Sequence, residues 1–238
     1  QLAAPSGRDW EATLRSWAKP ASDHEDERME NAERMIREAI KESRYLEGRT
    51  IEVFTQGSYR NNTNTRQDSD VDVGVVCRDY AYSDLSGVEG LTKEALGLGR
   101  GDYPFEDFKK DVTRALKWAF GTEGVKVGNK CIDVHENSYR VAADVVPCFE
   151  HHRYTHQDRH GNWSYDLGVQ FFADDGTKIV NWPEHHYDNG VEKNTATGSR
   201  FKFITRALKR VRAEMEEREI EQAKNIASFL IESMVFNA

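Results

Sequence analysis

The 238-residue sequence contains few cysteines and no long apolar run. Its three cysteines, Cys77, Cys131 and Cys148, are odd in number and widely spaced, which excludes a disulfide-stapled scaffold. Each lies in an apolar, strand-like context, so we expect three reduced and buried thiols. No stretch approaches the ~20 apolar residues of a membrane helix, and the first residues do not have the pattern of a signal peptide. We therefore expect a cytoplasmic protein that makes no membrane contact.

Basic residues are outnumbered as well. The sequence has 33 Lys and Arg against 41 Asp and Glu, a formal net charge of −8. Because non-specific binding of long nucleic acids normally requires a basic surface, strong binding of long DNA is not expected. A local basic pocket or metal ions can still bind nucleotides. With only five prolines and no low-complexity stretch, the sequence shows no linker that would separate domains sharply.

Hydrophobic periodicity predicts a helical start, a strand-rich middle and a helical end. The helical start covers 8–47 and includes a capping box at Ser22 and Glu25. A further helix is expected between Pro104 and Gly121. Strands are expected at 51–56 and 71–77, in a meander over 125–127, 131–135 and 139–146, and in hairpins up to 183, with closing helices at about 195–218 and 221–237.

The most informative motif is a Gly-Ser turn followed by two closely spaced carboxylates. Gly57 and Ser58 follow a predicted strand, and such a turn can offer backbone N–H groups and a hydroxyl to a phosphate. Asp70 and Asp72 begin the next strand, where side chains at i and i+2 point the same way and can share divalent cations. Asp68 has the same parity, but it lies earlier in the loop and is ranked outside the pair.

A third carboxylate, Asp144, lies alone in the apolar strand 139–147. An isolated Asp there is either on a solvent-facing side of the sheet or costly to bury unless it binds a cation. Beside Asp70 and Asp72, we interpret it as the third ligand of a two-metal site for Mg²⁺, with Mn²⁺ as the alternative. Such a site neutralises a triphosphate and activates an acceptor hydroxyl, whose proton Asp144 can take.

These motifs resemble those of the DNA polymerase β-like nucleotidyltransferases. The context of Gly57, Ser58, Asp70, Asp72 and Asp144 is most similar to the bacterial cGAS/DncV-like nucleotidyltransferases, and the similarity extends over about residues 50–236. The resemblance implies an α/β (α+β) fold of two lobes with a central active-site cleft. The catalytic lobe would be 1–190 and the helical C-terminal lobe 191–238, with a nucleoside triphosphate bound between them.

The C-terminal helix adds a basic face. Lys202, Arg206 and Lys209 lie at i, i+4 and i+7, and the apolar residues Ile204 and Leu208 lie on another face that we expect to pack on the core. A solvated charged stripe is the alternative interpretation.

The resemblance implies how the donor nucleotide is bound. Lys209 and Ser228 match the family's contacts to the β and γ phosphates, and Ser58 would contact the same phosphates from the opposite side. Lys202 and Arg206 are secondary candidates.

The expected reaction joins nucleoside triphosphates, which serve as donor and acceptor, into a short cyclic oligonucleotide of two or three units and releases pyrophosphate. The resemblance implies a second messenger of bacterial anti-phage signalling that a separate effector protein senses. Two alternatives stay open: transfer to another acceptor (a drug, tRNA or protein hydroxyl), or a catalytically silent nucleotide sensor. A His-rich stretch at 150–156 has no cysteines at zinc-finger spacing, so structural zinc is not expected.

Overall fold

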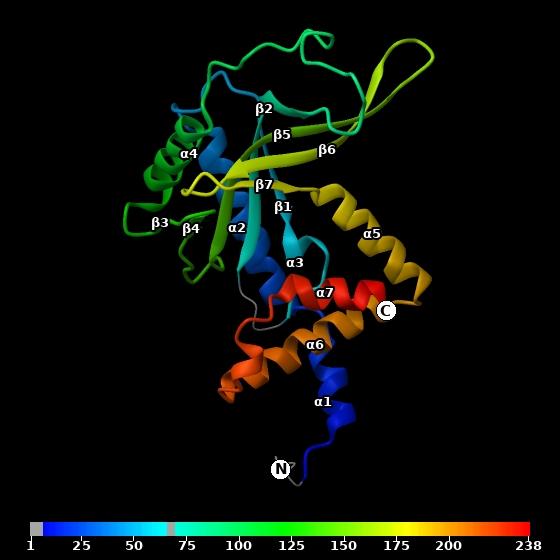
Figure 1. Cartoon of the computed structure of the whole chain (residues 1–238). Coiled ribbons are helices and arrows are strands. Elements are labelled where there is room, and N and C mark those ends of the chain that lie inside the picture. The colour runs from blue at the N-terminus through cyan, green and yellow to red at the C-terminus, as the bar shows by residue number, and fades with distance from the viewer. Residues whose placement is uncertain (1–6, 66–69) are drawn as a thin grey trace. The chain divides into compact units, whose positions relative to one another are not determined.

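The chain forms a mixed α/β structure, as predicted (Figure 1). The computed structural model describes residues 7–65 and 70–238. Its helices are α1 (Trp10–Trp17), α2 (Asp23–Lys41), α3 (Gly57–Arg60), α4 (Phe105–Phe120), α5 (Pro183–Ala196), α6 (Arg200–Glu217), the 3₁₀ turn η1 (Glu221–Ala223) and α7 (Ser228–Asn237). Its strands are β1 (Ile51–Gln56), β2 (Val71–Asp84), β3 (Val125–Val127), β4 (Ile132–Val134), β5 (Ala143–Gln157), β6 (Trp163–Phe172) and β7 (Lys178–Asn181).

Within the described residues the strands form one sheet in the order β1-β2-β5-β4-β3, with β6 beside β5 and β7 beside β6. The pair β2–β5 is parallel and the other pairs are antiparallel. The predicted meander of β3, β4 and β5 and the two predicted hairpins are confirmed. Helices α2 and α4 lie beside this sheet in Figure 1.

One face of the sheet forms the apolar core. The odd-numbered residues of β2 from Val71 to Cys77 are fully buried. On the neighbouring strand Phe149 belongs to the same face, and its ring stacks on Phe108 of α4 with centroids 5.2 Å apart. Because side chains alternate along a strand, the even-numbered residues of β2 and β5 point to the opposite face.

Local sequence signals account for several helix ends. Helix α4 begins after Pro104 and ends at Gly121, as predicted. The capping box at the start of α2 is confirmed, since the Ser22 backbone N–H donates to the Glu25 carboxylate at 2.8 Å and the Glu25 N–H donates to the Ser22 hydroxyl at 3.4 Å.

The predicted start of the first closing helix at about residue 195 is wrong. The structure has a separate helix, α5, over Pro183–Ala196, and α6 begins only at Arg200. Positive φ angles at Gly198 and Ser199 interrupt the helical conformation of the backbone between the two helices. Because α5 buries only Gly190, it has no apolar stripe, and its one sequence signal is Pro183 at the first helical position.

Strand β5 is also longer than predicted and runs through Pro147. Proline cannot donate a ladder hydrogen bond, so it fits a strand only where no neighbouring strand needs its N–H. Pro147 lies where β5 changes partner: pairing with β4 ends at Val145, and pairing with β6 starts at Phe149. The proline therefore lies at a point along β5 where neither β4 nor β6 pairs with the strand.

The chain divides into two compact units that are discontinuous in sequence. One contains residues 1–26, 58–69 and 186–238, and the other contains 27–57 and 70–185. We call them the helical unit and the sheet unit. The division into lobes at 1–190 and 191–238 stays a prediction.

Candidate active site

Three carboxylates form a row across the sheet unit. Asp72 of β2 is in register with Asp144 of β5, and Asp144 is in register with Asp133 of β4. Directly opposite residues of neighbouring strands have Cβ atoms about 5 Å apart and share one face. All three are half-buried on the face opposite the one that α4 covers. The sheet therefore brings together Asp72 and Asp144, which the sequence predicted, and Asp133, which it did not.

Asp70 lies just before β2, is exposed, and adds a fourth negative charge. Burial raises the pKa of Asp144 above the ordinary carboxyl value, and the charges of Asp133 and Asp70 raise it further. The ionised form of the cluster is therefore destabilised, and a bound cation would stabilise it. Asp68 is outside the described residues.

Gly57 is required at its position for two reasons. Its φ of +66° is in the left-handed region, and a Cβ built there would lie 2.0 Å from Asp72 Oδ2. The glycine thus leaves room for the carboxylate, and Gly57 lies directly beside the row of acids.

Ser58 follows in α3 and belongs to the helical unit. Ser58 is half-buried, and its backbone carbonyl accepts hydrogen bonds from the N–H groups of Thr63 at 2.9 Å and Asn64 at 3.2 Å. These bonds close a compact loop over 58–64.

The basic face of α6 is turned inward within the helical unit. The Arg206 guanidinium donates to the carbonyls of Ala18 at 2.7 Å and Asn62 at 2.5 Å. Lys202 is half-buried, and burial together with the charge of Arg206 lowers its pKa.

The orientation expected for α6 was therefore wrong. Arg206 and Lys209 are 8% and 2% exposed, whereas Ile204 and Leu208 are 43% and 42% exposed. The cations turn inward because carbonyls and a carboxylate of the helical unit satisfy them there.

Lys209 lies in a buried polar network centred on Glu232 of α7. Its ammonium donates to Glu232 Oε2 at 3.1 Å and to Thr63 Oγ1 at 3.3 Å. The Thr63 hydroxyl donates to Glu232 Oε2 at 2.8 Å, and His186 Nε2 lies 2.9 Å from Glu232 Oε1. Burial alone would raise the pKa of Glu232, but His186, Lys209 and Thr63 together lower it to about 2.

Glu232 was missed by the sequence reasoning. The available signal was a single carboxylate in the otherwise uncharged helix α7. Ser228 is the first residue of that helix and is half-buried, one turn before Glu232.

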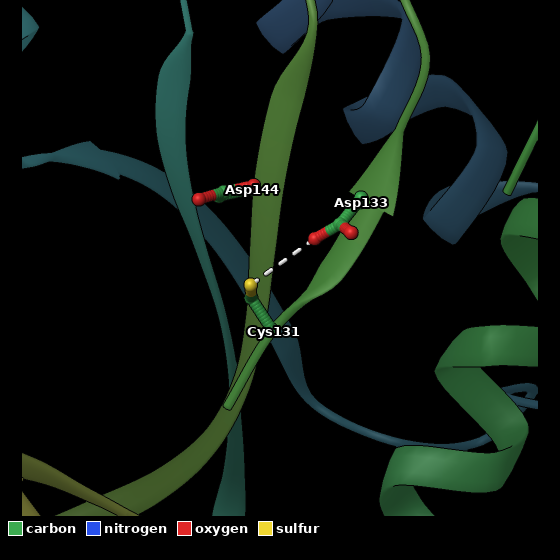
Figure 2. A group of neighbouring side chains, drawn as sticks. All are labelled: Cys131, Asp133 and Asp144. Carbon is green, nitrogen blue, oxygen red and sulfur yellow. Dashed lines mark hydrogen bonds between the residues drawn. The ribbon is translucent and has the colours of Figure 1, made fainter. Parts of the chain in front are cut away.

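Cys131 was expected to be a buried thiol, and this is wrong. Cys77 and Cys148 are buried, but Cys131 is half-buried just before β4. Its thiol donates to Asp133 Oδ1 at 3.3 Å, and Figure 2 shows both side chains beside Asp144. Burial and the charges of Asp144 and Asp133 raise the pKa of Cys131 to about 12. The signal in the sequence was the i, i+2 spacing of Cys131 and Asp133.

The region that contains this carboxylate row, residues 33–154, matches a family model described as a nucleotidyltransferase domain. A second model, the C-terminal helical domain of cGAS/DncV-like nucleotidyltransferases, matches residues 188–238. The chain belongs to the cGAS/DncV-like nucleotidyltransferases and is an enzyme of that class.

Named relatives agree. The cyclic dipyrimidine nucleotide synthase CdnE of Legionella pneumophila is 48% identical over 228 residues, covering 96% of this chain and 76% of that protein. The enzyme of the same name from Cecembia lonarensis is 43% identical, covering 95% and 75%. The structure of Rhodothermus marinus CdnE, a c-UMP-AMP synthase with Apcpp and Upnpp, matches with a TM-score of 0.80 at 30% identity and covers 99% of this chain and 75% of that one.

Proposed function

We propose that this protein joins two nucleoside triphosphates into a cyclic dinucleotide and releases pyrophosphate. The observation that carries the proposal is the cross-strand register of Asp72 with Asp144, with Asp70 two residues before Asp72. Family membership and the named synthases support the same reaction.

The donor atoms fit Mg²⁺ or Mn²⁺, because both ions prefer carboxylate oxygens. Asp70, Asp72 and Asp144 would hold two ions. Bound there, the ions supply charge neutralisation for the triphosphate and an acceptor hydroxyl of lowered pKa. Asp144 accepts the proton of that hydroxyl, and Gly57 keeps the approach to Asp72 open.

Phosphate binding is assigned to Ser58, Lys209 and Ser228, with Lys202 as a further candidate. Since Lys209 is paired with Glu232, its ammonium reaches a phosphate only by exchanging that partner. Arg206 already donates to two carbonyls, so we assign it to holding the 58–64 loop.

The two relatives that are 48% and 43% identical are both named cyclic dipyrimidine nucleotide synthases, which favours UTP and CTP as substrates. The product would act as a second messenger of anti-phage defence in the cytoplasm and be sensed by a separate effector protein. Within the described residues no helix has the length and apolar character needed to cross a membrane.

The test is to incubate the purified protein with each labelled nucleoside triphosphate and with their pairs, adding Mg²⁺ or Mn²⁺, and to measure pyrophosphate and phosphatase-resistant cyclic products. We expect a cyclic product that chelation of the metal abolishes and that the double variant Asp70→Ala, Asp72→Ala does not form.

Asp107→Asn is the control, because Asp107 is an exposed carboxylate of the sheet unit that pairs only with Lys110 among the described residues. Equal product from the wild type and the double variant would refute the proposal. Product that forms only after a non-nucleotide acceptor is added would favour the alternative transferase.

A further inference from the structure

A second donor set overlaps the carboxylate row. The side-chain ligand atoms of Cys131, Asp133 and Asp144 all lie within 4.8 Å of one another. Figure 2 shows them converging from the start of β4 and from β5. All three residues are half-buried, so solvent reaches them. Neither Asp70 nor Asp72 belongs to this group.

The second observation concerns the charge partners of Asp133 and Asp144. In the part of the chain that the structure describes, no Lys, Arg or His forms an ion pair with Asp133 or Asp144. The more a carboxylate is removed from water, the more it is stabilised by pairing with a cation or by binding a metal ion. Here the additional neighbour is a thiol, which brings no positive charge. Among the described residues, no cationic side chain therefore neutralises the charge of these two carboxylates.

One sulfur and two carboxylate oxygens form a donor set for Zn²⁺, Co²⁺ or Cd²⁺, whereas Mg²⁺ takes oxygen ligands. Tetrahedral Zn²⁺ with bonds of about 2.3 Å to sulfur and about 2.0 Å to oxygen separates the two ligand atoms by roughly 3.5 Å. The Cys131 Sγ to Asp133 Oδ1 distance is 3.3 Å. This hydrogen-bonded spacing is close to that of two ligands of one zinc ion, and the Asp144 carboxylate lies within 4.8 Å of both atoms.

We propose that Cys131, Asp133 and Asp144 form an inhibitory site for a thiophilic divalent cation such as Zn²⁺. Water completes the coordination, and the thiol proton passes to solvent when the metal binds. Because Asp144 is shared, zinc at this site withdraws it from the catalytic magnesium site, and occupancy of the two sites is mutually exclusive. The inhibitory part of this inference rests on the proposed function, whereas the metal site itself does not.

Metal binding is tested by titrating the metal-free protein with Co²⁺ and recording the sulfur-to-cobalt charge-transfer absorbance. We expect the band in the wild type and in Cys148→Ser, a control in which the removed thiol is 1% exposed. We expect no band in Cys131→Ser, and an affinity lowered by about tenfold or more in Asp133→Asn. A band that survives in Cys131→Ser, or that is absent from the wild type, overturns the site.

Thiol labelling of the wild type gives a readout that needs no variant. After maleimide treatment and peptide mapping, we expect Zn²⁺ to slow the labelling of Cys131, whereas Mg²⁺ at the same concentration does not. This readout decides the question if Cys131→Ser does not fold. Labelling that Zn²⁺ leaves unchanged contradicts the proposal.

Inhibition is measured separately, with each protein compared to its own rate without zinc. The Zn²⁺ concentration for half-inhibition should rise with Mg²⁺ concentration in the wild type, and should be about tenfold or more higher in Cys131→Ser. A wild type that has the cobalt band but no magnesium-dependent activity refutes the proposed function and keeps the site. Activity without the band refutes the site and keeps the function.

Discussion

At the residue scale, the candidate active site depends on close contacts between atoms that only particular side chains permit. Gly57 has no Cβ where Asp72 Oδ2 lies, and Asp133 reaches both Cys131 and Asp144. Asp72 is 15 residues away from Gly57 and Asp144 is on the strand next to Asp133, whereas Cys131 lies only two residues before Asp133. The contribution of each residue to the site therefore depends on the atoms that surround it in the fold.

Gly57→Ala should lower the rate of product formation by at least about 100-fold, because the new methyl group displaces the Asp72 carboxylate. Gly176→Ala is the matched control: it has a φ of +82° but nothing within 4 Å of its Cβ position. Both variants should lose about 1–3 kcal/mol of stability from backbone strain. Equal activity losses in the two would show that strain, rather than the contact with Asp72, causes the effect.

At the element scale, β5 and α6 show how tertiary partners override local patterns. β5 continues through Pro147 because its partner strand changes there. α6 turns its basic stripe inward because the 58–64 loop and α7 supply oxygen acceptors. A helical pattern locates a stripe, but the surroundings decide which stripe is buried.

The orientation of α6 predicts effects of very different size on stability for two neighbouring substitutions. Leu208→Lys should change the free energy of unfolding by only about 0.5 kcal/mol, because Leu208 is 42% exposed. Lys209→Met should lower it by about 3 kcal/mol, because Glu232 is then left buried without its ammonium partner. Urea denaturation measures both values. The reverse order would mean that α6 packs through its apolar face.

At the scale of the whole molecule, each unit is assembled from segments that are far apart in the chain. In the helical unit, Glu232 of α7 connects the distant 58–64 loop with the C-terminal helices α5 and α6 through Thr63, His186 and Lys209. A buried carboxylate with a strongly lowered pKa makes the stability of the fold depend on pH.

The free energy of unfolding should show this dependence. A depressed pKa in the folded state contributes stability that is present above the unfolded value of 4.5 and is lost as the pH falls toward about 2. The difference between wild type and Glu232→Gln should therefore be constant above about pH 5 and shrink below pH 4.5. Glu221→Gln, whose side chain is 76% exposed, should show no such trend. A pH-independent difference for Glu232→Gln would contradict the assigned network.

The sequence alone was sufficient for the features that local chemistry decides. Turn residues, the capping box and period-two alternation located α2, α4, β1 and the β3–β5 meander. The Gly-Ser turn and the spacing of Asp70 and Asp72 indicated the family, because these motifs are contiguous in the chain.

Only the tertiary structure decided which distant side chains meet. The register of β4 against β5 places Asp133 and Cys131 beside Asp144, and the packing of the helical unit pairs Glu232 with Lys209. α5 escaped detection because it lacks an apolar stripe. For the carboxylate row and the Glu232 network the physical reason is the same: strand register and burial depend on contacts between separate segments of the chain, which periodicity within one segment does not encode.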